Sequence, residues 1–147
     1  MTKTWILAAD ASRARIFEVD GRTRLREIES FAHPEGRAQN REINTDAEGR
    51  YNSGSQAQGH SSQPKLDAAQ HEAERFSRSL GGYLEQARVE HRYERLCLFA
   101  PPRFLGLMRS QLSKEAQRMV QEEVPKDISQ LGMQEIADYL KRHGTLH

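Results

Sequence analysis

The pattern of apolar and polar positions is clearest on either side of a double proline, Pro101-Pro102. Leu96 to Ala100 form an unbroken apolar run, which is typical of a strand buried on both faces. The prolines end that run, because proline cannot donate to a strand ladder and favours the first position of a helix. Apolar residues at helical spacing follow as far as Leu112. A buried strand that leads through a tight turn into an amphipathic helix predicts a layered α/β fold.

Three more strands are expected before this one. Alternating or apolar stretches cover residues 4–9, 13–19 and 24–32. Asp10 begins a turn between the first two, and Asp20-Gly21 is a hairpin signal between the second and the third. The third stretch has no wholly apolar face, which suits an edge strand. These strands are predicted to form an antiparallel meander.

A polar segment, residues 33–65, interrupts this pattern. Gly, Ser, Gln and Asn recur in it, and its larger apolar side chains are Ile43 and Tyr51. Such a segment cannot bury enough apolar area to offset its ordering entropy. It is predicted to be a long flexible loop within a single domain that spans residues 1–147, and a loop that becomes ordered on a partner is the alternative.

After Pro64, apolar residues at steps of three and four predict one long helix over residues 66–91. Gly81-Gly82 is a weak point in its middle, which close packing against a strand or a kink would explain. A fifth strand is expected over residues 118–124 and a last helix over residues 133–142. The order βββαβαβα predicts a mixed five-stranded sheet in the order 3-2-1-4-5 with helices on both faces, the ribonuclease-H-like topology.

Composition limits the classes of function. No stretch approaches the roughly 20 apolar residues that span a bilayer, and the apolar stretch near Met1 is too short for a signal peptide, so we expect a cytoplasmic protein with no membrane partner. Cys97 is the single cysteine, which excludes an internal disulfide. Formal net charge is +1, so bulk charge gives no support to nucleic-acid binding. No DNA partner is expected, and any RNA site has to be a local patch.

The sequence gives little support for a catalytic site or a metal site. Nucleases with this topology hold two Mg²⁺ ions on carboxylates, and Asp10 with Glu72 or Glu74 could supply some of them. The fourth strand ends without an acid, however, so a nuclease is disfavoured and Asp10 is interpreted as a turn residue. The six histidines show no metal-ligand spacing, and one cysteine excludes a thiolate zinc site. We therefore expect no metal and no other cofactor.

A local basic patch remains a candidate for phosphate binding. Its members are Arg103, Arg109, Lys114 and Arg118, opposed by Glu115, together with Arg50, Lys65 and Lys126. The alternative, that these residues form only a solvated helix face, stays open.

Several segments together resemble a known family. They are ILAADASRARIF, GRYNSGSQAQGHSS, HEAERFSRSLGGYL, LFAPPRFLGLMR and VPKDIS. They look like the bacterial host-attachment proteins, described as required for attachment to host cells, and the resemblance covers nearly the whole chain. APPRFLG followed some twenty residues later by PKD is its most specific part. That family is in turn similar to the middle domain of archaeal and eukaryotic peptide-chain release factors, which has the ribonuclease-H-like topology.

This resemblance implies a site in the polar segment. In release factors, a Gly-Gly-Gln motif before the long helix promotes hydrolysis of peptidyl-tRNA. Gly54-Ser55-Gln56 lies in the equivalent position, with Ser55 in place of the second glycine. The resemblance therefore makes Gln56 the catalytic candidate and Gly54, Ser55 and His60 candidate binding residues. Whether the protein is an enzyme stays open.

Two functions of different classes follow. The first is an RNA- or ribosome-binding module, with the ribosome or tRNA as partner and ribosome rescue as its role. It would use residues 33–65 and the surface around Arg103 and Lys126. The second is a non-catalytic regulatory factor that binds a protein partner and affects attachment to host cells indirectly.

Overall fold

The chain forms a single mixed sheet flanked by helices. The computed structural model describes residues 2–20, 24–33 and 56–146, and for residues 56–66 it describes the backbone alone. The strands are β1 (Lys3–Ala9), β2 (Arg13–Asp20), β3 (Arg24–Ala32), β4 (Arg95–Phe99) and β5 (Val120–Val124). Their order in the sheet is β3-β2-β1-β4-β5. Antiparallel pairing joins β1 to β2 and β2 to β3, whereas β1 pairs with β4, and β4 with β5, in parallel.

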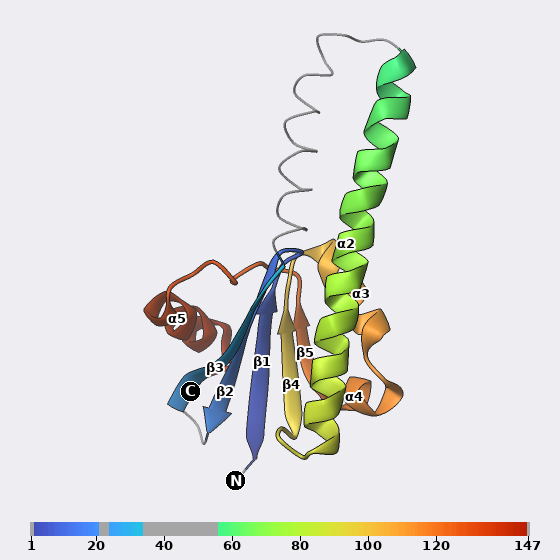
Figure 1. The fold of residues 1–147 in the computed structure, drawn as a ribbon. Helices are drawn as coiled ribbons and strands as arrows, with labels where there is room; N and C mark the ends of the chain where they lie inside the picture. The colour runs from blue at the N-terminus through green and yellow to red at the C-terminus, as the bar shows by residue number, and fades with distance from the viewer. Residues whose placement is uncertain (1, 21–23, 34–55, 147) are drawn as a thin grey trace.

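The helices lie on both faces of this sheet. They are α2 (Gln56–Val89), α3 (Pro102–Gln111), α4 (Lys114–Met119) and α5 (Met133–His143). In Figure 1, α2, α3 and α4 cover one face and α5 covers the other. The predicted α/β class, strand order and two-sided helix arrangement are confirmed, and the strand order is consistent with the ribonuclease-H-like topology.

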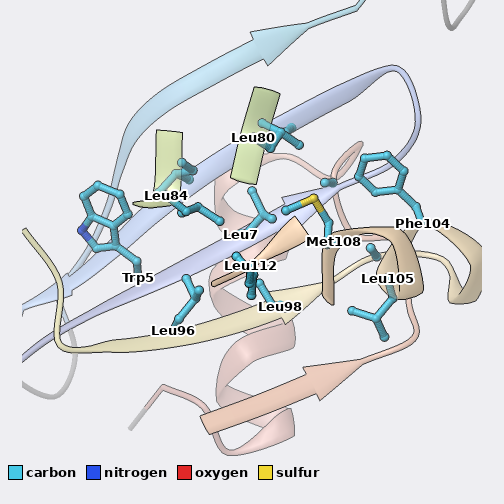
Figure 2. Close-up of a cluster of buried hydrophobic side chains, with 14 of the residues drawn as sticks. Trp5, Leu7, Leu80, Leu84, Leu96, Leu98, Phe104, Leu105, Met108 and Leu112 are labelled. Carbon is cyan, nitrogen blue, oxygen red and sulfur yellow. The ribbon is translucent and has the colours of Figure 1, made fainter. Parts of the chain in front are cut away.

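The predicted strand before the double proline is buried on both faces, as expected. Leu96 and Leu98 of β4 pack in the cluster beneath α2 and α3, and Cys97 and Phe99 pack in the cluster beneath α5. Figure 2 shows the first of these clusters. β4 lies between β1 and β5 because an all-apolar strand can leave both of its faces dry only at the centre of a sheet.

Trp5 of β1 anchors one end of the cluster beneath α2. Its indole is fully buried, and Nε1 donates a hydrogen bond to the Glu18 carboxylate at 3.1 Å. The ring lies 5.0 Å from that of Tyr93 and 6.2 Å from that of Tyr83, and the guanidinium of Arg92 sits over it at 5.0 Å. Burial raises the pKa of Glu18, but the hydrogen bonds from Trp5 and Arg26 outweigh burial and leave that pKa below its usual value.

The long helix begins ten residues earlier than the sequence indicates. We expected a helix over residues 66–91, but α2 starts at Gln56, so residues 56–65 are helical rather than part of the loop. Its 34 residues span about 51 Å at 1.5 Å each, whereas the nine residues of β3 span about 30 Å. The N-terminal part of α2 therefore projects beyond the sheet (Figure 1). Residues 34–55, the rest of the expected loop, lie outside the described residues.

The glycine pair within α2 is explained by a neighbouring helix. A Cβ at Gly81 would lie 2.9 Å from the backbone oxygen of Gln111 at the end of α3. A Cβ at Gly82 would meet nothing within 4 Å. Close packing thus accounts for Gly81, but the partner is a helix rather than the strand we considered.

The fifth strand is shorter than predicted. Residues 118–119 belong to the short helix α4, and β5 begins at Val120. Ser113 caps α4, because its Oγ accepts a hydrogen bond from the backbone N–H of Ala116 at 3.0 Å. The six residues of α4 are too few to show an apolar periodicity that indicates a helix, so the sequence did not predict this element.

Candidate functional site

The carboxyl ends of β1 and β4 form the edge of the sheet where a ligand is most readily bound. These two strands are parallel neighbours, and the chain leaves β1 towards β2 on one side and β4 towards β5 on the other. In α/β sheets, ligands bind in the crevice outside such a switch point. Asp10 follows β1 here, and Pro101 follows β4.

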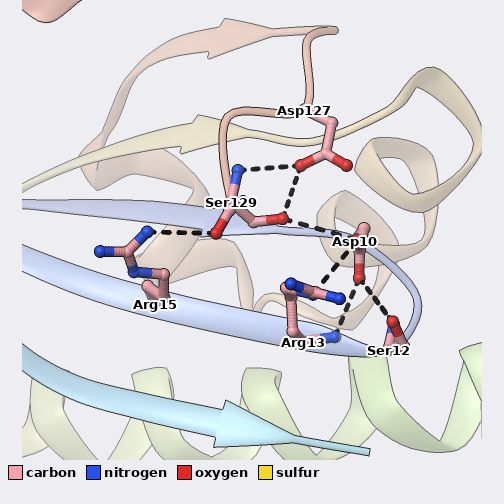
Figure 3. A network of polar contacts seen from close by, with 6 residues as sticks. All are labelled: Asp10, Ser12, Arg13, Arg15, Asp127 and Ser129. Atoms are coloured by element: carbon pink, nitrogen blue, oxygen red, sulfur yellow. Dashed lines mark hydrogen bonds and ion pairs between the residues drawn. The ribbon is translucent and has the colours of Figure 1, made fainter. Parts of the chain in front are cut away.

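Asp10 holds the turn between β1 and β2, as the sequence predicts. Its Oδ1 accepts hydrogen bonds from the backbone N–H of Ser12 at 2.8 Å, from Ser12 Oγ at 3.1 Å and from the backbone N–H of Arg13 at 2.9 Å (Figure 3). Its Oδ2 has more distant neighbours, Ser129 Oγ at 3.5 Å and Arg13 Nε at 3.8 Å. One carboxylate oxygen is thus saturated by the turn, and the other retains acceptor capacity.

A second turn of the same type comes from the segment after β5. Asp127 Oδ1 accepts hydrogen bonds from the backbone N–H of Ser129 at 2.9 Å and from Ser129 Oγ at 2.6 Å. Arg15 of β2 donates to the backbone oxygens of Ser129 and Leu131 and forms an ion pair with Glu27 at 2.8 Å. Figure 3 shows the contacts of Ser129 with Asp127 and Arg15 next to Asp10. The segment after β5 is thereby fixed to the end of β1.

Sequence reasoning missed this second turn, although a signal was present. Asp127-Ile128-Ser129 repeats the Asp-x-Ser spacing of Asp10-Ala11-Ser12. In both turns the aspartate side chain accepts a hydrogen bond from the backbone N–H of the serine two residues later. The repeat could have indicated two similar turns. It could not have indicated that the turns meet.

A cavity of about 240 Å³ opens at the same edge. It is lined by Asp10, Ala11, Ala73, Pro101, Arg103, Phe104 and Leu107. Its walls are mostly apolar, and Arg103, on the first turn of α3, is exposed and forms no ion pair with any described residue. The volume is below the roughly 300–1,000 Å³ of sites that enclose a whole small molecule, so the cavity fits one part of a larger ligand.

His33, at the end of β3, brings α2 to this edge. Its backbone N–H donates to the oxygen of Ser12 at 2.8 Å, and its Nε2 lies 2.9 Å from Glu72 Oε1. The His33 ring stacks on Phe76 at 5.1 Å, and Phe76 lies 5.9 Å from Phe104 of the cavity wall. An aromatic row therefore runs from the end of β3 to the cavity, and nothing in the sequence indicated it.

Two of the carboxylates considered for magnesium, Asp10 and Glu72, have other partners. Glu72 pairs with His33 and lies 3.9 Å from Arg75, and Asp10 accepts hydrogen bonds within its own turn. Over the described ranges, no group of three or more His, Cys, Asp or Glu side chains could hold a metal ion.

The predicted binding residues fall into separate places. Arg103 borders the cavity. Arg109 is paired with Glu123, with Nε 2.8 Å from Oε1, and this hydrogen bond raises the pKa of Arg109. Lys126 lies over the ring of Tyr139 of α5 at 5.6 Å. Of these three cations, Arg103 is the one at the cavity.

The remaining predicted residues belong to the outer end of α2 and the segment before it. Gln56 is the first residue of α2, at the end furthest from the sheet (Figure 1). His60 and Lys65 lie in the part of α2 whose backbone alone is described. Arg50, Gly54 and Ser55 lie outside the described residues.

The outer surface of α2 carries basic residues that sequence reasoning did not single out. His71, Arg75 and Arg78 are exposed at steps of four and three residues, so they share one side of the helix. The Arg75 side chain is 60% exposed, and Arg78 forms no ion pair within the part of the chain that the structure describes. Their spacing could have indicated a row of basic residues on one side of the helix, but not that this side is exposed.

Comparisons with known proteins add the family. A family model described as "Protein required for attachment to host cells" matches residues 5–140, which include all of the sheet edge described above. The comparison with curated proteins gave no match. In the described part of the chain, no helix is both long and apolar enough to cross a membrane.

Proposed function

The chain belongs to the family of proteins required for attachment to host cells, and from this premise we propose that it is an RNA-binding module that acts on the ribosome or on tRNA. The observation that carries the proposal is Arg103, which borders the cavity at the carboxyl ends of β1 and β4 and forms no ion pair with the described part of the chain. An exposed guanidinium without a carboxylate partner is suited to a phosphate, which it can contact through two parallel hydrogen bonds.

The exposed basic residues on α2 support a second set of contacts with RNA. Arg75 and Arg78 are exposed on the side of α2 that faces away from Ala73, which lines the cavity. They could contact further backbone phosphates of a strand that passes from the cavity over the helix. Contacts of this kind position RNA without reading its sequence.

The projecting end of α2 supports the ribosome as the place of action. Gln56 begins this helix, far from the sheet, where it could enter a narrow site that the domain cannot. We extend the proposal to rescue of stalled ribosomes, with Gln56 as the residue that organises a water at the ester of peptidyl-tRNA. A protein that influences attachment to a host through translation would satisfy the family description.

Ribosome co-sedimentation and tRNA binding test this proposal. Wild type should sediment with ribosomes at low salt and dissociate steeply as salt rises, because phosphate contacts release counterions. Arg103→Ala and Arg78→Ala should each weaken binding. Arg142→Ala is the matched control, since Arg142 is an exposed arginine on α5, across the sheet. Equal losses in all three variants, or no binding at low salt, would contradict the proposal.

The catalytic extension has its own test. Gln56→Ala should retain ribosome binding but lose any release of the peptide from peptidyl-tRNA. If wild type binds ribosomes and releases no peptide, the module binds without hydrolysis. If the protein captures a specific protein partner and no RNA, the regulatory alternative is correct.

A further inference from the structure

We propose that the cavity at the carboxyl ends of β1 and β4 holds one unstacked nucleobase that carries an exocyclic amino group, with the adjoining phosphate on Arg103. This inference rests on the proposed RNA-binding function and names what the same site selects. Adenine, cytosine and guanine carry such a group, and uracil does not.

The walls of the cavity fit the flat faces of a base. Ala11, Ala73, Pro101, Phe104 and Leu107 supply them, so most of the lining cannot hydrogen-bond. The volume of about 240 Å³ suits one ring system of a longer molecule. Single-stranded RNA is recognised in this way, with a splayed base in an apolar pocket and its edge read by a polar group.

Asp10 is the polar group that would read that edge. Among the described lining residues it is the one carboxylate, and its Oδ1 is occupied by three donors of its own turn. No donor from the described residues lies close to its Oδ2, because Ser129 Oγ lies 2.6 Å from Asp127 but 3.5 Å from Asp10. An additional N–H from a ligand could therefore be accepted at Oδ2.

The acceptor character of a carboxylate gives the selectivity. An ionised carboxylate accepts hydrogen bonds and donates none, so an amino group is favoured. Uracil presents a ring N–H flanked by two carbonyl oxygens, and those oxygens would be repelled by the negative charge of Asp10. The turn fixes which oxygen faces the ligand, so the side chain cannot rotate to relieve this repulsion.

Asp10→Asn should change the preference rather than abolish it. The N–H groups of Ser12 and Arg13 require an oxygen at the Oδ1 position, so the amide nitrogen of asparagine must take the place of Oδ2. That nitrogen donates, so the variant should prefer the carbonyl edge of uracil. Asparagine also supports turns of this type, which preserves the fold.

The experiment measures anisotropy of labelled ten-nucleotide RNAs bound to the full chain. Wild type should bind oligo(A) and oligo(C) about tenfold more tightly than oligo(U), and Asp10→Asn should reverse this difference. Arg103→Ala should weaken all three RNAs similarly and lower the salt slope by about one. Arg142→Ala should change neither the affinity nor the preference.

Leu107→Trp keeps the proposal testable if Asp10→Asn does not fold. This half-buried wall residue belongs to α3 rather than to the turn, so a larger side chain should close the cavity and remove the preference while leaving salt-dependent binding. Equal wild-type affinity for the three RNAs would overturn the base pocket and leave the proposed function intact. Absence of binding to every RNA would overturn both.

Discussion

The two halves of α2 have the same backbone conformation and opposite surroundings. From residue 73 to residue 87, the helix lies on the sheet and buries Ala73, Phe76, Leu80, Leu84 and Ala87. From residue 56 to residue 72, it projects beyond the sheet, and its described side chains in that stretch are exposed or half-buried. Helix formation is cooperative, with a costly nucleus and cheap extension. The packed half can therefore supply the nucleus from which the polar half is extended.

Amide hydrogen exchange should separate the two halves most clearly. Amides at residues 76–87 can exchange only when the helix leaves the core, which requires global unfolding. Amides at residues 60–70 can exchange by fraying from the projecting end. We expect exchange in the outer half to be faster by at least about a thousandfold. Equal protection would show that contacts as strong as those of the sheet hold the outer half.

Leu84→Ala should cause a large loss of stability. Leu84 is fully buried in the cluster beneath the helix, and its truncation leaves a cavity. We expect urea denaturation to show a loss of about 2–5 kcal/mol. Arg78→Ala, on the exposed side, should change the free energy of unfolding by less than about 0.5 kcal/mol. Similar values for both variants would mean that the packed half does not nucleate the helix.

The two adjacent glycines should respond in opposite directions to alanine. Gly81→Ala places a methyl group against the Gln111 backbone and should destabilise the protein by about 1–3 kcal/mol. Gly82→Ala meets nothing and should stabilise it by up to about 1 kcal/mol, because glycine is a poor helix former. Thermal unfolding of both variants measures this difference. Stabilisation by both would exclude the close approach of α2 to α3.

Glu85 should give the smallest effect on the free energy of unfolding, and that effect should depend on pH. Hydrogen bonds from Arg88 and then from Ser113 lower the pKa of Glu85 from 4.5 to about 2. The carboxylate therefore stabilises the fold above pH 4.5, and this contribution is lost as the pH falls towards 2. Its side chain is 37% exposed, so the contribution is screened and about 0.2–1 kcal/mol at pH 7.

Glu85→Gln should remove this dependence. Chemical denaturation at pH 7 should show the variant slightly less stable than wild type, and the two should converge by about pH 2. Glu115→Gln, at an exposed position of α4, is the control. A stability difference that stays constant from pH 5 to pH 2 would show that Glu85 does not act through its charge.

The core of the fold could be predicted because its signals are local. The apolar run that ends at Pro101 identified β4, and strand alternation with short turns identified β1, β2 and β3. The start of α2 could not be predicted in the same way. Residues 56–65 have a polar composition typical of a loop, and their helical state depends on the adjoining packed half.

The candidate site was predictable only in its separate parts. Asp10 and Arg103 were recognised from their own surroundings, as a turn residue and as a basic residue. The meeting of Asp10 with Ser129, and of His33 with Glu72, depends on contacts between residues more than 30 positions apart. The pairing of Arg109 with Glu123 likewise removes a cation that charge counting assigned to the patch.

The aromatic surroundings of Trp5 give the molecule a spectroscopic reporter. The chain has one tryptophan, Trp5 on β1, and its side chain packs against Tyr83 near the inner end of α2 and bonds to Glu18 of β2. Its emission should therefore be dominated by a single, water-shielded environment. Detachment of the inner end of α2 would expose the indole and shift that emission to longer wavelength, whereas fraying of the projecting end would leave the spectrum unchanged. Fluorescence can thus follow the packed half of the helix separately from the projecting half.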